Sequence, residues 1–504
     1  MEPAAPSADD SDHAPFLSAV DKNRPSTKSW NGKFIQPFTI VNNHVPDGLV
    51  EDGGTVEDFM TECCHRWLGA LSRAFGGESD RRGGRRSQWD DCFSSHAKEG
   101  QQLAISIRPR VNSSPGGKSA GTLEQGAKGG SHKHLMYAHH DERMKSDVKV
   151  LLKDIPRSRP ECFHQPTVKP LMQLVEKNAS GLCFGTPEEQ AAFLEHQSGE
   201  SQSDCVSPLI CGFQGRLRRL LLAYLHRHHS PGYGQGMTPV AAVLLACADC
   251  SLFPNGLAPL KSAVSGGERL DVDNAATQTS DDVAMKERQL VIDSSDNIAF
   301  WLFCHLVANV LPQDFYAPLP TPMHGLIVEI SVTMVLLPSI LPELHSSLTP
   351  IQRQLLMSVV FPKWFASLFV DELPLACTLL IFDKMYGEAG FDALCLAAIA
   401  LLRLCSHRVI VQNSANNLNV DVSLSDVSTN MSMVDIIKAV CAELDVNNLS
   451  ASIDWAQKQI SHKRLIAVRT KAHGMIQDRW LDNGKFGTAR VFVFLLMRGI
   501  FHDR

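Results

Sequence analysis

The residues best placed to do chemistry lie in a short loop between two apolar helices. Pro231 and Gly232 end the first helix, because proline removes a backbone donor and glycine frees the chain. Thr238 and Pro239 give a start signal for the second helix, as an N-cap and a first helical residue. Gln235 lies between these signals. Its carboxamide is therefore held beside a helix N-terminus, where free N–H groups favour an approaching anion.

An arginine stands at a second break in the helical pattern. The pattern over 140–153 ends where Pro156 and Pro160 force the chain out of the helix. Arg157 lies between these prolines, and Asp154 is close enough in sequence to hold its guanidinium. Taken alone, such an Asp–Arg pair is usually a surface salt bridge worth under about 1 kcal/mol. A glutamine beside a helix start is likewise more often a cap or a solvent-facing residue. The residue type alone therefore does not establish a functional role for Arg157 or for Gln235.

A phosphate-binding loop is a separate hypothesis. Gly117, Lys118 and Ser119 resemble the end of a P-loop, which would make the chain a nucleotide-binding enzyme. The full pattern needs a glycine five residues before Gly117, and Asn112 stands there instead. The glycine-rich run that follows also argues against the helix that a P-loop requires.

Histidines and cysteines suggest metal ligands only by their number. No His-Glu-x-x-His or paired Cys-x-x-Cys framework accompanies them. The single Cys-x-x-Cys formed by Cys247 and Cys250 ends an apolar helix, where small side chains pack. The basic cluster of Arg81, Arg82, Arg85 and Arg86 is typical of a solvated linker, and the alternative is a membrane-surface or phosphate-binding role. The histidines concerned are His132, His134, His139, His140, His226, His228 and His229.

Helical patterns dominate the chain, and the alternation typical of strands is scarce. The first clear pattern places Phe59, Cys63, Trp67 and Leu71 at four-residue steps. Prolines punctuate the later apolar runs, and the Asn- and Ser-rich residues 411–430 predict a loop. We expect helices at Val56–Phe75, Ile298–Leu311, Met323–Leu336, Ile351–Phe361, Trp364–Val370, Leu375–Tyr386, Phe391–Leu404, Met433–Leu444 and Ser452–Met475.

Composition and charge exclude several classes of protein. Hydrophobic residues make up 44% of the 504 residues, enough for a large core, and the net charge of −6 gives no basic field for nucleic acid. The 14 cysteines have no regular spacing and favour reduced thiols in the cytosol. The acidic N-terminus lacks the apolar core of a signal peptide, and the apolar runs are too short or too interrupted to span a bilayer. We therefore expect a soluble protein.

Three segments, in order, resemble the TBC-domain family, whose members act as GTPase-activating proteins for Rab-type small GTPases. Residues 151–157 read Leu-x-x-Asp-x-x-Arg, which is similar to the family's Ile-x-x-Asp-x-x-Arg motif. Residues 233–237 read Tyr-Gly-Gln-Gly-Met, which is similar to its Tyr-x-Gln-Gly-Met motif. Residues 364–383 are similar to its Trp-Phe…Phe…Leu-Pro…Ile-Trp-Asp segment, with Phe382 in place of tryptophan. The resemblance covers about 140–405.

The family's first motif, Arg-x-x-x-Trp, has two candidate positions. Arg85 and Trp89 fit its letters but lie in a Gly- and Arg-rich stretch without helical periodicity. Trp67 has helical surroundings, but Cys63 stands where the arginine belongs.

The resemblance implies an all-α, multi-helix TBC fold with roles for both polar motifs. Arg157 would be an arginine finger whose planar fork binds phosphate oxygens, and Gln235 would be a glutamine finger that orients water. Asp154 would orient Arg157, while Tyr233 and Gly236 would support the loop that carries the glutamine. An arginine supplied in trans contributes roughly 10³–10⁵-fold to the rate of GTP hydrolysis.

The resemblance also implies the partner. A GTP-bound Rab-type GTPase would bring its own magnesium and nucleotide, so we expect no cofactor and no metal in this chain. The chain would be a GTPase activator rather than an enzyme with its own substrate pocket, acting in vesicle trafficking from the cytoplasm. Peripheral association with endomembranes would come through partners. The alternative is a non-catalytic TBC-fold scaffold for Rab or trafficking proteins, and the presence of both finger residues favours the activator.

The predicted organisation has a disordered N-terminal tail, one TBC domain with a divergent first part and two polar insertions, and a C-terminal tail of unassigned role. These regions are 1–50 for the tail, 51–475 for the domain, 51–139 for its divergent part, 161–210 and 254–292 for the insertions, and 476–504 for the C-terminal tail.

Overall fold

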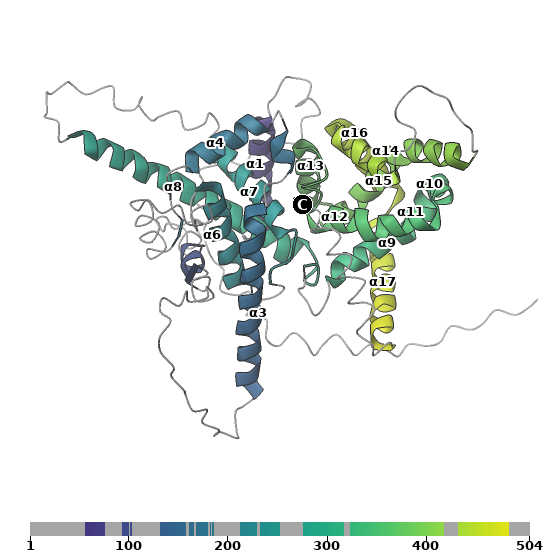
Figure 1. The fold of residues 1–504 in the computed structure, drawn as a ribbon, viewed down its shortest axis with the longest axis horizontal. Coiled ribbons are helices and arrows are strands. Elements are labelled where there is room, and N and C mark those ends of the chain that lie inside the picture. The colour runs from purple at the N-terminus through teal and green to yellow at the C-terminus, as the bar shows by residue number, and fades with distance from the viewer. Residues whose placement is uncertain are drawn as a thin grey trace, which may run out of the picture.

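A computed structural model gives the arrangement shown in Figure 1. Within the residues it describes, every regular element is a helix, so the predicted all-α fold is confirmed. The described residues are 56–75, 93–99, 101–102, 132–157, 161–165, 168–179, 182, 184–185, 212–228, 232–252, 276–316, 323–417 and 432–482.

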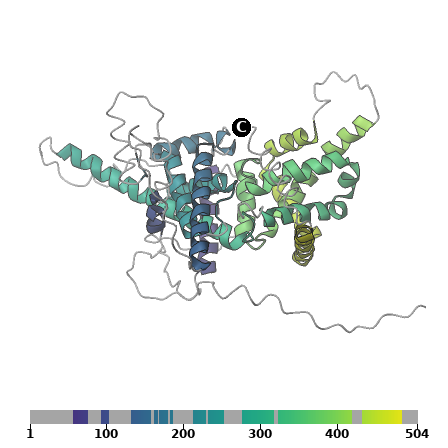
Figure 2. The ribbon, with the colours of Figure 1, turned by 60° about the horizontal axis from the view of Figure 1, so that its bottom comes forward.

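The helices form two groups that lie side by side (Figures 1 and 2). The N-terminal group contains α1 (Val56–Phe75), α3 (His132–Asp154), η2 (Ile155–Arg157), η3 (Glu161–His164), α4 (Lys169–Ala179), α6 (Gly212–Arg227), α7 (Met237–Leu252) and α8 (Ala276–His305). The C-terminal group contains η5 (Leu306–Val310), α9 (His324–Ile340), α10 (Pro342–Ser347), α11 (Pro350–Leu355), η6 (Leu356–Val360), α12 (Phe361–Ala366), α13 (Leu375–Tyr386), α14 (Asp392–Asn417), α15 (Met433–Ala442), α16 (Val446–Gln459) and α17 (His462–Asp482).

The helix α7 is the centre of the N-terminal group. All of its residues except Pro239 and Leu252 are buried, and α1 and α8 pack along it while α6 flanks it. A helix that is apolar on all sides must be covered on all sides, which explains this central position. Cys247 and Cys250 are buried thiols of this core, as their setting in the sequence predicted.

A buried ionic network joins α6, α7 and α8. Arg216 donates two hydrogen bonds to Asp249, at 2.7 Å and 2.6 Å, and a third to Asp296 at 2.7 Å. Arg219 binds the second oxygen of Asp296. Burial by itself lowers the pKa of Arg216, but the two carboxylates more than offset this and raise it above its usual value. Because its charges are paired, the network fixes the relative positions of the three helices without leaving a buried charge uncompensated.

Asp383 on α13 connects the two groups. Its Oδ1 accepts from the Arg66 Nε at 2.9 Å and from the Trp67 indole at 3.2 Å, both on α1. The Trp67 ring also stacks on Tyr386 at 5.0 Å and contacts Phe382. The tryptophan of α1 is therefore a core residue that packs against the Ile-Phe-Asp segment and donates a hydrogen bond to its aspartate. Arg85 and Trp89, the other candidates for the first motif, lie outside the described residues.

Arg469 of α17 performs a similar task in the C-terminal group. It donates two hydrogen bonds to the buried Glu329 of α9, at 2.9 Å and 2.7 Å, and also binds Asp392 at the start of α14. Burial raises the pKa of Glu329, and the guanidinium of Arg469 counteracts part of that rise. This arginine therefore holds α17 against both α9 and α14.

Most predicted helices are present, with changed bounds. Val56–Phe75 and Leu375–Tyr386 agree with α1 and α13 residue for residue. The single helix expected over Ser452–Met475 is wrong, because the chain is extended at Ile460 and α17 begins anew after it. The Ser461 hydroxyl accepts a hydrogen bond from the Arg464 backbone N–H at 3.3 Å and caps this new start.

Both regions predicted as polar insertions contain core helices. The helix α4 packs on α6, and its Met172 and Val175 are buried in the main core. The helix α8 begins at Ala276 and runs through the end of the second region, where Ile292 is fully buried. These helices were not predicted, because their few apolar residues stand among many polar ones in the sequence.

The predicted boundaries of the loop and tail also shift. The helix α14 continues to Asn417, into the stretch expected as a loop, and α17 continues to Asp482, past the expected domain end at 475. The predicted tail over 1–50, residues 483–504 of the tail predicted over 476–504, and the motif at 117–119 lie outside the described residues.

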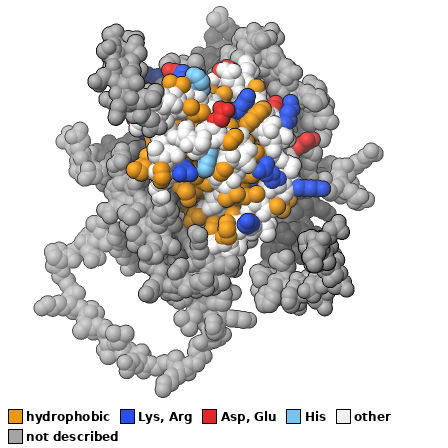
Figure 3. Space-filling model, turned by 90° about the vertical axis from the view of Figure 1, so that its right-hand side faces the viewer, with side chains coloured by type: hydrophobic (Ala, Val, Ile, Leu, Met, Phe, Trp, Pro, Cys, Tyr) orange, Lys and Arg blue, Asp and Glu red, His pale blue; other side chains and the backbone are white. Residues whose placement is uncertain are grey.

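Among the residues that the structure describes, two stretches are long and apolar enough to cross a membrane by length and composition. They are Arg288–Val310 and Asp392–Ser414, and 67% and 61% of their most apolar windows are buried inside the protein. Core helices of large proteins have this same composition, so these stretches are weak evidence for a membrane span. Apolar side chains also reach the surface of the C-terminal group, where Figure 3 shows them interspersed with lysine and arginine.

Candidate functional site

The hydroxyl of Tyr233 links the loop after α6 to the end of α3. It donates a hydrogen bond to the Asp154 carboxylate, with 2.9 Å between the oxygens, and lies 2.6 Å from the Thr238 hydroxyl. Because the single phenolic proton goes to the carboxylate, Thr238 must donate to Tyr233. A chain of three polar groups thus runs from α7 through the loop to the last residue of α3.

The side chain of Asp147 binds the backbone of the same loop. Its carboxylate accepts a hydrogen bond from the Tyr233 backbone N–H at 3.2 Å. Asp147 and Asp154 are seven residues apart and therefore lie on one face of α3, two turns from each other. This spacing was visible in the sequence, but nothing there indicated which segment the face would meet.

The glycines of the loop allow it to pack closely on the C-terminal group. Gly236 has φ +101°, and a Cβ there would lie 2.0 Å from the carbonyl oxygen of Ala366. A Cβ on Gly234 would lie 2.8 Å from the ring of Tyr316, whose hydroxyl donates to that same Ala366 carbonyl at 2.7 Å. Both positions require glycine because there is no room for a side chain.

The end of α12 provides this contact surface. Leu368 and Phe369 follow it with positive φ values of 49° and 67°, which are unusual for residues other than glycine. Both are fully buried, so packing compensates the backbone strain. The resulting tight turn leaves the Ala366 carbonyl directed at Tyr316 and at the loop.

Burial controls the protonation of the site. It raises the pKa of the Tyr233 phenol well above its usual value, and the neighbouring Asp154 carboxylate raises it further. Burial also raises the pKa of Asp147, against the opposing effects of the Tyr233 backbone N–H and of Arg143. Tyr233 therefore remains a neutral donor throughout the physiological range.

The predicted site residues occupy neighbouring segments. Arg157 is the last residue of η2, directly after α3, and η2 packs against α6; the side chain of Arg157 is outside the description. Gln235 is half-buried in the turn that precedes α7. Asp154 and Tyr233 are in direct contact, and Gly236 ends the loop.

One prediction about the loop is corrected. Thr238 is not the N-cap of α7, since the helix begins at Met237, whose backbone N–H bonds the Gly234 carbonyl at 3.1 Å. The Thr238 side chain points to Tyr233 instead. The sequence analysis also missed Asp147, Tyr316 and Ala366, because their roles depend on contacts between distant segments.

Comparison with known proteins finds TBC domains. The family model of the Rab-GTPase-TBC domain matches residues 212–410. The chain is 25% identical over 177 residues to the human growth hormone-regulated TBC protein 1, covering 35% of this chain and 38% of that protein. It is 31% identical over 101 residues to the rat protein of the same name, covering 20% and 33%. A TBC domain-containing protein of Schizosaccharomyces pombe is 22% identical over 204 residues, covering 40% and 19%.

These matches define the class of domain that the chain contains. Residues 212–410 match the Rab-GTPase-TBC domain, and the all-α fold with its Tyr-Gly-Gln-Gly-Met loop agrees with that assignment. The matches span between about a fifth and two fifths of the relatives' lengths. The matched range contains Tyr233 and Gln235 but begins after Asp154 and Arg157.

Proposed function

We propose that this protein accelerates GTP hydrolysis by a Rab-type small GTPase, using Arg157 and Gln235 as residues supplied in trans. The observation that carries the proposal is the hydrogen bond from Tyr233 to Asp154. It joins the segment that contains the arginine to the loop that contains the glutamine, although the two are far apart in the chain.

The surroundings of Gln235 support a role in positioning. The loop is fixed from one side by Asp147 and Asp154 and from the other by the contact of Gly236 with Ala366. A carboxamide on a rigid loop beside a helix N-terminus can hold a water near a phosphate at little entropic cost. Gln235 is half-buried, so part of its surface is open to a partner.

Arg157 would neutralise the charge that develops on the transferred phosphoryl group. Its segment follows α3 directly, and Asp154, which Tyr233 holds in place, lies one helical turn before it. An arginine that reaches phosphate oxygens with its planar fork is the most effective residue for this task. Magnesium and nucleotide would be contributed by the GTPase.

The biological setting follows from the partner. We place the protein in the cytoplasm, where it would act in vesicle trafficking and reach endomembranes through its partners. Surface complementarity over many residues determines which Rab protein is recognised.

Single-turnover GTP hydrolysis by a panel of GTP-loaded Rab proteins tests the proposal. With a cognate Rab, we expect Arg157→Ala to remove most of the stimulation, by a factor of roughly 10³ or more. Arg157→Lys should restore little, because an ammonium cannot bind two oxygens in a fixed plane. Arg408→Ala, a change to an exposed arginine on α14, is the matched control and should leave the rate unchanged.

The scaffold alternative gives a different pattern. A scaffold would bind GTP-locked Rab but leave phosphate release at the intrinsic rate, with or without Arg157. An unchanged stimulated rate in Arg157→Ala would also refute the finger mechanism.

A further inference from the structure

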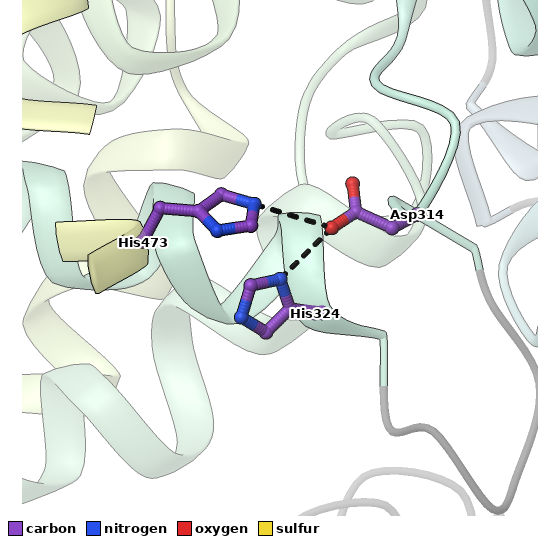
Figure 4. A group of neighbouring side chains, drawn as sticks. All are labelled: Asp314, His324 and His473. Carbon is purple, nitrogen blue, oxygen red and sulfur yellow. Dashed lines mark hydrogen bonds and ion pairs between the residues drawn. The ribbon is translucent and has the colours of Figure 1, made fainter. Parts of the chain in front are cut away.

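A carboxylate and two imidazoles from three separate segments meet at the start of α9. The Nδ1 of His324 lies 2.9 Å from Oδ2 of Asp314, and the Nε2 of His473 lies 3.6 Å from the same oxygen (Figure 4). The two rings stand edge to face, with centroids 4.2 Å apart. One ligating atom from each of the three residues lies within 4.8 Å of the others.

The backbone places two of these residues firmly. His324 is the first residue of α9, and the turn over 311–316 that carries Asp314 packs on the same helix start. A Cβ on Gly325 would lie 2.7 Å from Oδ1 of Asp314, so glycine allows this close approach. The Gly325 backbone N–H also donates to the Asp314 carbonyl at 3.2 Å.

His473 comes from α17 and completes the group. It follows Arg469 by four residues, so both lie on the face of α17 that meets α9. Its side chain is half exposed, which leaves an open side for solvent.

We propose that Asp314, His324 and His473 form a site for a divalent transition metal ion, with Zn²⁺ as the ion that fits best. Two imidazoles and one carboxylate, with a fourth position left for water, are a common zinc ligand set. With bond lengths of about 2.0–2.2 Å, two tetrahedral ligand atoms lie about 3.3–3.5 Å apart. The two observed nitrogen–oxygen distances bracket this value, and the two imidazole nitrogens lie within 4.8 Å of each other, so side-chain rotations can bring the three atoms to this spacing.

A second histidine–aspartate pair on the same helix provides the contrast. The Nδ1 of His462 lies 2.5 Å from Oδ2 of Asp392, but Arg469 already binds the other oxygen of that carboxylate. That pair has the charge balance of a structural ion pair and lacks a second imidazole. Asp314 has two imidazoles and no arginine among the ion pairs of the described residues.

A metal ion at this position would attach the second half of α17 to the rest of the C-terminal group. Arg469 holds the helix to α9 one turn earlier, and the metal would add a bond to α9 and to the turn that follows η5. Binding to the folded state alone raises stability in proportion to the logarithm of metal concentration. This inference does not depend on the proposed action on Rab proteins.

The test compares metal binding by variants of the full chain. After chelation, the wild-type protein should bind one equivalent of Zn²⁺ that both Asp314→Asn and His473→Ala weaken by at least about tenfold, each removing one of three ligands. His462→Ala is the matched control and should bind as the wild type does. This comparison is needed because the chain contains 20 histidines, any of which could bind zinc more weakly.

Two further readouts keep the test independent of folding defects. Co²⁺ bound in place of zinc should give the visible absorption of a tetrahedral site in the wild type and in His462→Ala, and lose it in the two ligand variants. Zn²⁺ should also slow amide hydrogen exchange in α17 of the wild type. Equal affinity in all four proteins, or an exchange rate in α17 that zinc leaves unchanged, would overturn the proposal.

Discussion

At the scale of single residues, the site depends on one phenol and one glycine. Tyr233 is the only group in the described structure that contacts both Asp154 and Thr238 by hydrogen bonds, and Gly236 brings its loop against Ala366. For each residue the chain offers a control position outside this loop: Tyr386 for the buried phenol and Gly390 for the glycine with positive φ. A change at the control position shows the effect on stability alone.

Tyr233→Phe should reduce both stability and stimulated GTP hydrolysis. The change keeps the ring but removes the hydroxyl that donates to the Asp154 carboxylate and accepts from the Thr238 hydroxyl, which costs about 1–3 kcal/mol. Tyr386→Phe is the control, because that buried hydroxyl donates to the Leu302 carbonyl at 2.9 Å away from the loop. It should lower the free energy of unfolding, measured in urea, but not the hydrolysis rate. Equal rates in both variants would contradict a positioning role for Tyr233.

Gly236→Ala should be far more costly than Gly390→Ala. Both glycines have positive φ, which costs an alanine about 1–2 kcal/mol. Only Gly236 adds a clash with a backbone carbonyl, for which displacement typically costs a further 1–3 kcal/mol or so. A Cβ on Gly390 meets nothing within 4 Å. Urea denaturation of the two variants measures the difference, and similar losses would show that the loop can move away from α12.

At the scale of elements, charged side chains inside the protein set how helices meet. The clearest case is Arg216, whose two buried carboxylate partners come from α7 and α8. His305 at the end of α8 differs from Arg216: it is buried beside Tyr386 and Asn309, and burial lowers its pKa, which favours the neutral imidazole.

Arg216→Met should destabilise the N-terminal group by about 3–5 kcal/mol. The variant fills most of the same volume but leaves Asp249 and Asp296 buried with less compensating charge. Arg464→Met, on the exposed surface of α17, is the matched control and should change the free energy of unfolding by less than about 0.5 kcal/mol. Thermal denaturation compares the two, and a neutral Arg216→Met would mean that the carboxylates find other donors.

His305 should make the protein less stable in mild acid. Burial lowers its pKa in the folded state below the unfolded value of about 6.5, so the unfolded chain binds the proton more readily. Its contribution to stability is complete above that value and is lost as the pH falls toward and through the folded pKa. The free energy of unfolding should therefore decrease from pH 7.5 to pH 5.5, and His305→Gln should reduce the decrease. An identical pH dependence in the variant would assign the effect to other histidines, such as His65.

At the scale of the whole molecule, the sequence predicts where helices form better than it predicts which helices contact each other. Apolar periodicity located α1 and α13 to the residue, because the repeat and the flanking breakers are both local signals: glycines border α1, and Pro374 precedes α13. The break at Ile460 was missed since its only local sign is the Ser461 cap. The motif at 233–237 indicated the loop, but the contact of Tyr233 with Asp154 arises only when α3 and α6 pack together.

The bond between Asp383 and the tryptophan of α1 bears on how the protein can be divided. A fragment that holds only residues 212–410 would keep the loop at 233–237 but lose Arg66 and Trp67. Its α13 would then present an orphaned carboxylate and an uncovered aromatic surface to water, and α7 would lose the helix packed along it. Recombinant pieces trimmed to the homologous region should for this reason precipitate, while those starting before Val56 should remain in solution.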